Sequence, residues 1–150
     1  MTDRLTLAGA EAIAGSALNA ARAVGVRATV AVVDAGGHLM ALRRDDGAGF
    51  IGVEIARMKA WTAAASGMTT ARWNELASAP AVAPIVAADG VMAVAGGRPL
   101  WSGDVLIGAV GVSGGSPNRT IIWRRSPPAA DLSAACRPRS RSSARPSPRR

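Results

Sequence analysis

One hairpin constrains the fold more than any other stretch of this chain. An apolar run that ends at Val33 is followed by the turn Asp34-Ala35-Gly36-Gly37-His38, and a second apolar run begins at Leu39. A tight turn between two strands requires positive φ angles, which glycine adopts without steric cost. We expect the Asp34 carboxylate to accept hydrogen bonds from the turn backbone. The sequence therefore predicts two adjacent antiparallel strands with the 1 histidine of the chain beside their turn.

Hydrophobic periodicity and turn residues predict the remaining elements. The expected helices are Leu7–Ala23 with Thr6 as its N-cap, Phe50–Ser66 ended by Gly67, and a short helix from the cap Thr70 to Ala77. The expected strands are Val26–Asp34, Leu39–Arg44, Val91–Ala95, Pro99–Trp101 at an edge, and Val105–Val112. The Pro- and Ala-rich stretch Ala79–Ala88 is expected to be a loop. Short connections imply antiparallel pairing, so we predict an α+β fold with helices over one face of a five-stranded antiparallel sheet.

The positive charge is confined to one end of the chain. The formal net charge is +8, yet residues 1–118 hold nine basic and nine acidic side chains, whereas residues 119–150 hold nine arginines and one acid, Asp131. We therefore expect one domain over residues 1–118 and an Arg/Pro/Ser-rich tail over residues 119–150. Three interpretations of the tail stay open: a natural disordered segment, an electrostatic contact to nucleic acid, or a shifted reading frame at the end of a GC-rich gene.

Composition also limits the compartment and the partners. The 1 cysteine is Cys136, so no disulfide can form within the chain. The first residues lack the pattern of a signal peptide, and no apolar stretch is long enough to span a membrane. We expect a soluble, cytoplasmic protein whose partners include neither membranes nor, despite the basic tail, nucleic acid.

Six blocks of the sequence resemble, in order, the GlcG/HbpS family of haem-binding-type proteins, which includes the C-terminal domain of PduO-type proteins. The blocks are Leu5–Leu7, Ala31–Leu39, Arg44–Ala48, Lys59–Ala63, Gly96–Leu100 and Gly108–Gly115. The resemblance implies a PAS- or profilin-like five-stranded antiparallel sheet with flanking helices, a haem ligand, and assembly into homo-oligomers. It ends after Pro117, where family members continue with an amphipathic helix and this chain does not.

The resemblance and the residue types together give a candidate cofactor site. His38 is the candidate metal ligand for haem iron, and its alternative interpretation is an exposed turn histidine. Arg44, Asp46 and Lys59 match the polar blocks of the family. Arg44 and Lys59 are expected to meet the carboxylates of haem or of a small organic acid, or else the loop after the hairpin forms a structural ion pair with the second helix. Ser113 joins the set within the Gly-rich stretch Gly111–Gly115, which is either a close backbone approach or an anion nest.

These residues favour a binding protein. One histidine provides no Ser-His-Asp or Cys-His arrangement, so no catalytic residue is assigned and enzymatic activity stays undecided. The leading hypothesis is binding of haem or a related carboxylate-bearing ligand in an apolar pocket near the hairpin, with Arg44 and Lys59 positioning its acid groups. The alternative is an accessory protein or enzyme that acts on a small organic acid in a catabolic operon. A third hypothesis is an assembly subunit without a ligand.

Overall fold

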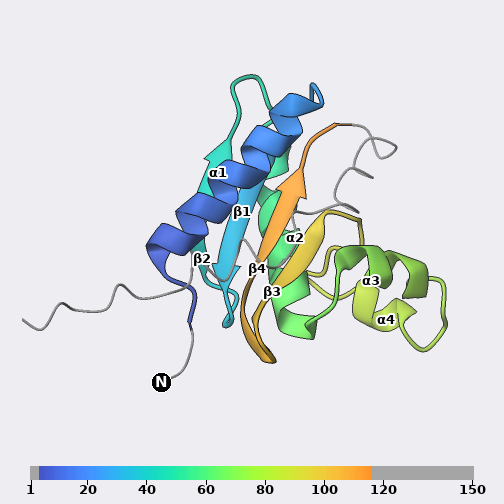
Figure 1. Cartoon of the computed structure of the whole chain (residues 1–150). Coiled ribbons are helices and arrows are strands. Elements are labelled where there is room, and N and C mark those ends of the chain that lie inside the picture. The colour runs from blue at the N-terminus through green and yellow to red at the C-terminus, as the bar shows by residue number, and fades with distance from the viewer. Residues whose placement is uncertain (1–3, 116–150) are drawn as a thin grey trace, which may run out of the picture.

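The computed structural model describes residues 4–115 as one sheet between helices (Figure 1). In chain order the elements are α1 (Leu7–Ala23), β1 (Thr29–Asp34), β2 (Leu39–Arg44), α2 (Ile51–Ser66), α3 (Thr70–Leu76), α4 (Ala83–Val86), β3 (Gly97–Ser102) and β4 (Val105–Ser113). No helix in this described part is long and apolar enough to cross a membrane. The predicted tail, residues 119–150, lies outside the described residues.

All strand pairs are antiparallel, and the strands lie in the order β2-β1-β4-β3. The α+β class is confirmed, but within residues 4–115 the sheet has 4 strands instead of the five predicted. The missing strand is the apolar run Val91–Ala95. The backbone of this run forms hydrogen bonds with side chains. The Met92 amide donates to Thr62 Oγ1 (2.9 Å), and the Ala93 carbonyl accepts from Asn74 Nδ2 (2.8 Å).

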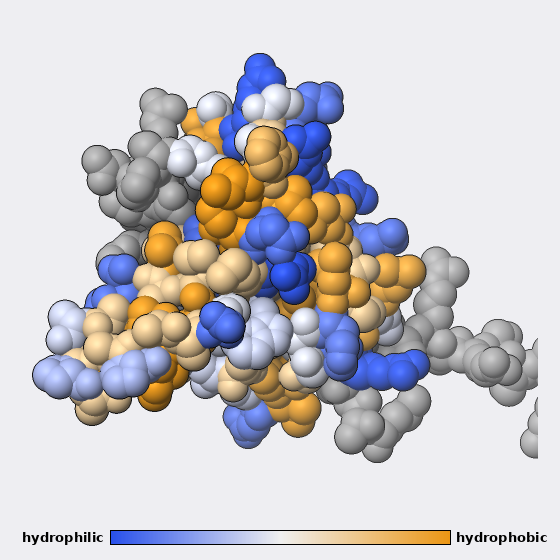
Figure 2. All heavy atoms as spheres, turned by 180° about the vertical axis from the view of Figure 1, so that it is seen from behind, coloured by the Kyte–Doolittle hydropathy of each residue, from blue (hydrophilic) through white to orange (hydrophobic). Residues whose placement is uncertain are grey.

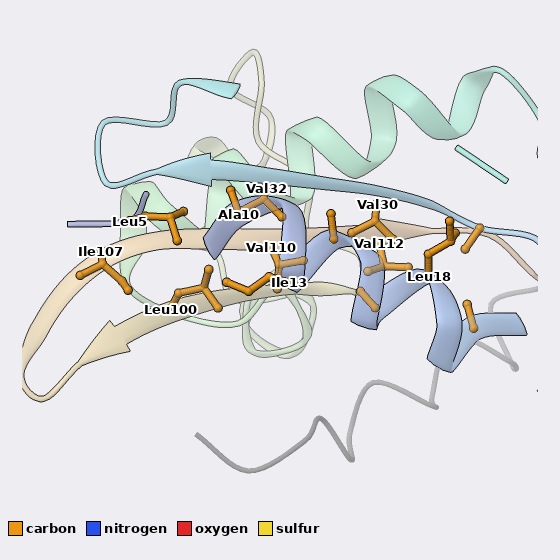
Figure 3. Close-up of a cluster of buried hydrophobic side chains, with 14 of the residues drawn as sticks. Leu5, Ala10, Ile13, Leu18, Val30, Val32, Leu100, Ile107, Val110 and Val112 are labelled. Carbon is orange, nitrogen blue, oxygen red and sulfur yellow. The ribbon is translucent and has the colours of Figure 1, made fainter. Parts of the chain in front are cut away.

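Helices cover both faces of the sheet, which corrects the expectation that they share one face. α1 lies in front of the sheet in Figure 1 and α2 behind it. Val30 and Val32 of β1 pack with α1 in the larger core cluster, which Figure 3 shows in close-up. Val33 belongs to a second cluster with alanines of α2. Because successive strand residues point to opposite faces, β1 is buried on both sides.

Glycine in β4 allows α2 to approach the sheet closely. A side chain at Gly111 would overlap the backbone carbonyl of Ala56 in α2. The helix ends where predicted, because Gly67 adopts a left-handed conformation with φ 65°. α2 is thereby fixed against the middle strands, with its first turn beside the end of β4.

Two local predictions near α3 are wrong. Thr69, not Thr70, caps α3, because its side chain accepts from the Arg72 amide. Thr70 is instead fully buried, and its hydroxyl accepts from the Gly97 amide of β3 (2.8 Å). The stretch expected to be a loop contains α4, which begins with Pro84 in its first turn.

Candidate functional site: the hairpin and its cavity

The β1–β2 turn is organised by one carboxylate. Asp34 Oδ1 accepts from the backbone amides of Gly36 (2.9 Å) and His38 (2.9 Å), as expected from the sequence. Gly37 has φ 82°, which only glycine adopts easily. Partial burial raises the pKa of Asp34, but the hydrogen bonds from His38 and Gly36 outweigh it and hold that pKa below its ordinary value. The turn therefore presents a fixed, ionised carboxylate at neutral pH.

His38 is oriented by the same carboxylate. Its Nδ1 lies 3.2 Å from Asp34 Oδ1, and its side chain is 81% exposed. A proton on Nδ1 would donate to Asp34, which leaves Nε2 as the unprotonated ring nitrogen. This carboxylate–imidazole pair is the arrangement that fixes the tautomer of metal-ligating histidines.

A cavity of about 500 Å³ lies beside this turn. Its apolar wall comes from the chain before α1, from β2 and from the start of β4, and its polar rim comes from Arg4 and Asp34. The lining residues are Arg4, Leu5, Thr6, Leu7, Asp34, Ala35, Gly36, Met40, Leu106 and Ile107. A volume of this size falls within the range of small-molecule and cofactor sites. An apolar pocket near the hairpin was predicted, but Arg4 as its cation was not.

Arg44 and Asp46 lie at the opposite end of β2 from His38. The Arg44 side chain donates to the carbonyl of Ala48 (2.9 Å), and the Asp46 carbonyl accepts from Arg27 (2.8 Å). Both side chains are exposed. Within one chain, the structure therefore does not bring these two residues to the histidine.

The ion pair of this loop involves a residue that the sequence did not single out. Arg22 at the end of α1 donates to both carboxylate oxygens of Asp45, at 2.7 Å and 3.1 Å to Oδ1 and at 3.2 Å to Oδ2. The hydrogen bond from Arg22 lowers the pKa of Asp45 against the effect of its burial. Asp45 thus fastens the loop to α1, which is a structural role.

Lys59 belongs to α2 and lies on the side of this helix that faces the sheet, where only 4% of the residue is exposed. Its Nζ donates to the carbonyl of Val112 (3.1 Å), and a side chain at Gly96 would approach Nζ to 3.0 Å. Burial lowers the pKa of Lys59 from 10.5 to about 8. Its ammonium group is therefore directed into the α2–β4 interface and away from the hairpin cavity.

Ser113 ends β4 on the same face of the sheet as α2. It pairs with Thr29 of β1, and both residues are buried. Thr29 Oγ1 has no hydrogen-bond partner among residues 4–115. A methyl group on Gly52 would lie 3.1 Å from Thr29 Oγ1 and 3.6 Å from the Ser113 hydroxyl, so α2 closes over both hydroxyls.

The five expected site residues therefore occupy three places. His38 lies at the hairpin, Arg44 and Asp46 lie at the far end of β2, and Lys59 and Ser113 lie in the interface between α2 and the sheet. Sequence reasoning missed two neighbours of the hairpin. Arg4 precedes the block Leu5–Leu7, which already belonged to the resemblance, and Trp61 packs against the turn, since a side chain on Gly37 would contact its indole.

Comparison with known proteins gives one consistent result. The family model described as haem degrading protein HbpS-like matches residues 5–119. Protein GlcG of Escherichia coli is 39% identical over 85 residues, which is 57% of this chain and 63% of GlcG. The chain thus aligns with less than two thirds of the length of that relative.

Solved structures support the same relationship. HbpS of Streptomyces reticuli superimposes with a TM-score of 0.74 at 29% identity, covering 89% of this chain and 88% of that one. PduOC, solved as a complex with heme, superimposes with a TM-score of 0.71 at 27% identity, covering 88% and 94%. On the family match and these likenesses, the chain belongs to the HbpS-like family.

Proposed function

We propose that the protein binds haem, or a closely related carboxylate-bearing planar ligand, in the cavity beside the β1–β2 hairpin. The observation that carries the proposal is that Asp34, Ala35 and Gly36 of the turn line this cavity of about 500 Å³, while the same Asp34 lies 3.2 Å from Nδ1 of His38, the residue that follows the turn. The HbpS-like family match and the heme complex of PduOC support the choice of ligand class.

The residues present fit such a ligand. His38 would offer Nε2 to the iron, while Asp34 fixes the ring and makes the imidazole a stronger donor. Leu5, Met40 and Ile107 would contact the apolar macrocycle and exclude water. Arg4 at the rim would meet a propionate carboxylate. Bound haem would supply an iron centre capable of redox or gas chemistry, and His38 is the residue that would hold it.

A site for free metal ion fits less well than haem. Among residues 4–115 no three His, Cys, Asp or Glu side chains gather into a cluster able to hold a metal ion. A macrocycle needs only one protein imidazole, because it brings four nitrogen ligands of its own.

Titration with haem tests the proposal directly. We expect the full chain to give a saturable Soret band that His38→Ala shifts or abolishes. Asn19→Ala, an exposed change on α1, is the control and should leave the spectrum unaltered. A full chain that folds by circular dichroism yet shows no saturable band would contradict haem binding.

A second candidate is a small organic acid in the same cavity, as in an accessory protein or enzyme of a catabolic operon. The observation that favours it is the position of Arg4 and the first turn of α1 at the cavity, since a cation and a helix N-terminus both attract carboxylates. Thermal stabilisation by 2-hydroxy or 2-oxo acids, without haem binding, would support it. A response to neither ligand would leave an assembly subunit as the remaining hypothesis.

A further inference from the structure

The cavity beside the hairpin holds two opposite charges that do not neutralise each other. Arg4 and Asp34 both line it, yet among residues 4–115 no ion pair joins them. Within the same residues the guanidinium group of Arg4 has no hydrogen-bond or ion-pair partner. Arg4 is also exposed, so a ligand can reach it without any movement of the core. The cavity therefore presents a cation and, separately, a carboxylate to whatever enters it.

Asp34 keeps one of its two oxygens unused. Oδ1 accepts from the amides of Gly36 and His38 and lies within hydrogen-bond distance of the His38 ring. Oδ2 accepts no hydrogen bond from any residue that the structure describes. The carboxylate is ionised at neutral pH, and the strongest hydrogen bonds to such an oxygen come from positively charged donors. Oδ2 is therefore a suitable partner for an ammonium group.

The start of α1 strengthens the positive side of the cavity. Thr6 and Leu7 line the cavity at this end of the helix, and no acidic residue lies in the first turn. A helix N-terminus carries partial positive charge and favours anions. Arg4 lines the same cavity, so it adds a full charge to this partial one. Together they suit a carboxylate.

The rest of the cavity wall is largely apolar, and Figure 3 shows two of its residues, Leu5 and Ile107, at one end of the larger core cluster. Leu7, Met40 and Leu106 complete this apolar part. Figure 2, the view from behind, shows hydrophobic residues gathered over the opposite face of the molecule as well. Apolar surface alone therefore does not distinguish the cavity, whereas two unlike charges set in an apolar wall do.

We propose that this cavity binds a zwitterion with an apolar side chain, namely an α-amino acid whose carboxylate meets Arg4 and whose ammonium group meets Oδ2 of Asp34. Both charged groups of such a ligand are attached to one carbon atom, so it can bridge two side chains that do not reach each other. Its side chain would displace water from the apolar wall. Haem would use Arg4 but has no cation for Asp34. The inference therefore goes beyond the proposed function and rests neither on His38 nor on iron.

Calorimetric titration of the full chain without haem tests the ligand class. We expect L-leucine or L-phenylalanine to bind saturably. Isocaproate, which is leucine without its ammonium group, and isoamylamine, which is leucine without its carboxylate, should each bind roughly ten- to a hundredfold more weakly than L-leucine. A protein that folds by circular dichroism but binds neither amino acid overturns the inference. Isocaproate or isoamylamine that binds as tightly as L-leucine also overturns it.

Substitution of the two charged residues tests the site. Arg4→Gln should weaken L-leucine binding roughly ten- to a hundredfold, whereas Arg72→Gln, at an exposed arginine of α3, should leave it unchanged. An Arg4→Gln variant with wild-type affinity overturns the site.

Asp34→Asn keeps an oxygen for the turn amides but removes the charge. We expect it to lose the preference for L-leucine over isocaproate, which a merely structural change in the turn would not do. A folded Asp34→Asn variant that keeps this preference overturns the role of Asp34. If this variant fails to fold, Arg4→Gln and the two leucine analogues still decide the inference.

A haem titration of the same preparation separates this inference from the proposed function. Saturable binding of L-leucine by a protein that gives no Soret band would refute haem binding and support the amino-acid site. A saturable Soret band in a protein that binds neither amino acid would refute the amino-acid site and leave haem binding standing.

Discussion

The buried charge of Lys59 lowers the stability of the folded protein at neutral pH. Its ammonium group is buried with one backbone carbonyl as acceptor, and burial lowers its pKa to about 8. The folded state therefore binds fewer protons than the unfolded chain between pH 8 and 10.5. Below this window the buried charge disfavours folding, and as pH rises through it the penalty is relieved.

The pH dependence of unfolding should reveal this. We expect the wild type to gain roughly 1–3 kcal/mol between pH 7 and pH 10.5 relative to Lys59→Met, because only the wild type sheds the buried charge. Urea unfolding at both pH values measures the difference. Arg57→Met, an exposed change on α2, serves as the control and should follow the wild type. Parallel pH curves for wild type and Lys59→Met would refute the burial argument.

Side-chain partners were predictable only where they are local. The bonds from the turn amides to Asp34 follow from the sequence of the turn, and the structure confirms them. The cluster Arg43-Arg44-Asp45-Asp46 gave no indication of which acid would be buried. Asp45 is the buried one because α1 places Arg22 beside it, and Arg22 lies 23 residues away in the chain.

Among the elements, α1 was predicted with its correct bounds because its signals are local. Thr6 caps it, and Gly25 follows its last turn with φ 72°. Val91–Ala95 was mispredicted because its apolar pattern fits a strand, while distant side chains of α2 and α3 take its backbone bonds. The run Thr29–Val33 is buried throughout, and such a continuous run is typical of a strand covered on both faces.

The close approach of α2 to the sheet depends on Gly111. We expect Gly111→Ala to destabilise the protein by about 1–3 kcal/mol or more, because the added methyl group overlaps the Ala56 carbonyl. Gly49→Ala is the matched control, since nothing lies within 4 Å of a side chain there. Thermal denaturation followed by circular dichroism measures both, and equal melting temperatures would contradict the packing.

At the scale of the whole molecule, residues 4–115 by themselves build a 4-stranded sheet with two buried core clusters. We therefore propose residues 1–118 as the folding unit and expect that fragment to unfold at the same urea concentration as the full chain. Circular dichroism across a urea titration compares the two. A lower midpoint for the fragment would show that residues 119–150 contribute to stability, against the predicted domain boundary.

The candidate site could be predicted only in part, because its residues are far apart in a single chain. The histidine and its carboxylate follow from one turn, but neither the cavity wall nor the distance from His38 to Arg44 can be derived from local sequence. The sequence blocks supplied candidate residues without indicating that these residues lie at three separate places in the fold.

The unequal edges of the sheet also limit how large a β-paired assembly can grow. A sheet with two regular edges can add copies at both ends, which is the route to fibrils. In the described part of the chain Pro99 interrupts the β3 edge, so of the two edges within residues 4–115 only β2 is a regular template. Two copies joined through β2 would each present β3 outward, and that ribbon ends after eight strands, the 4 of each copy. One proline would thus make strand addition self-terminating.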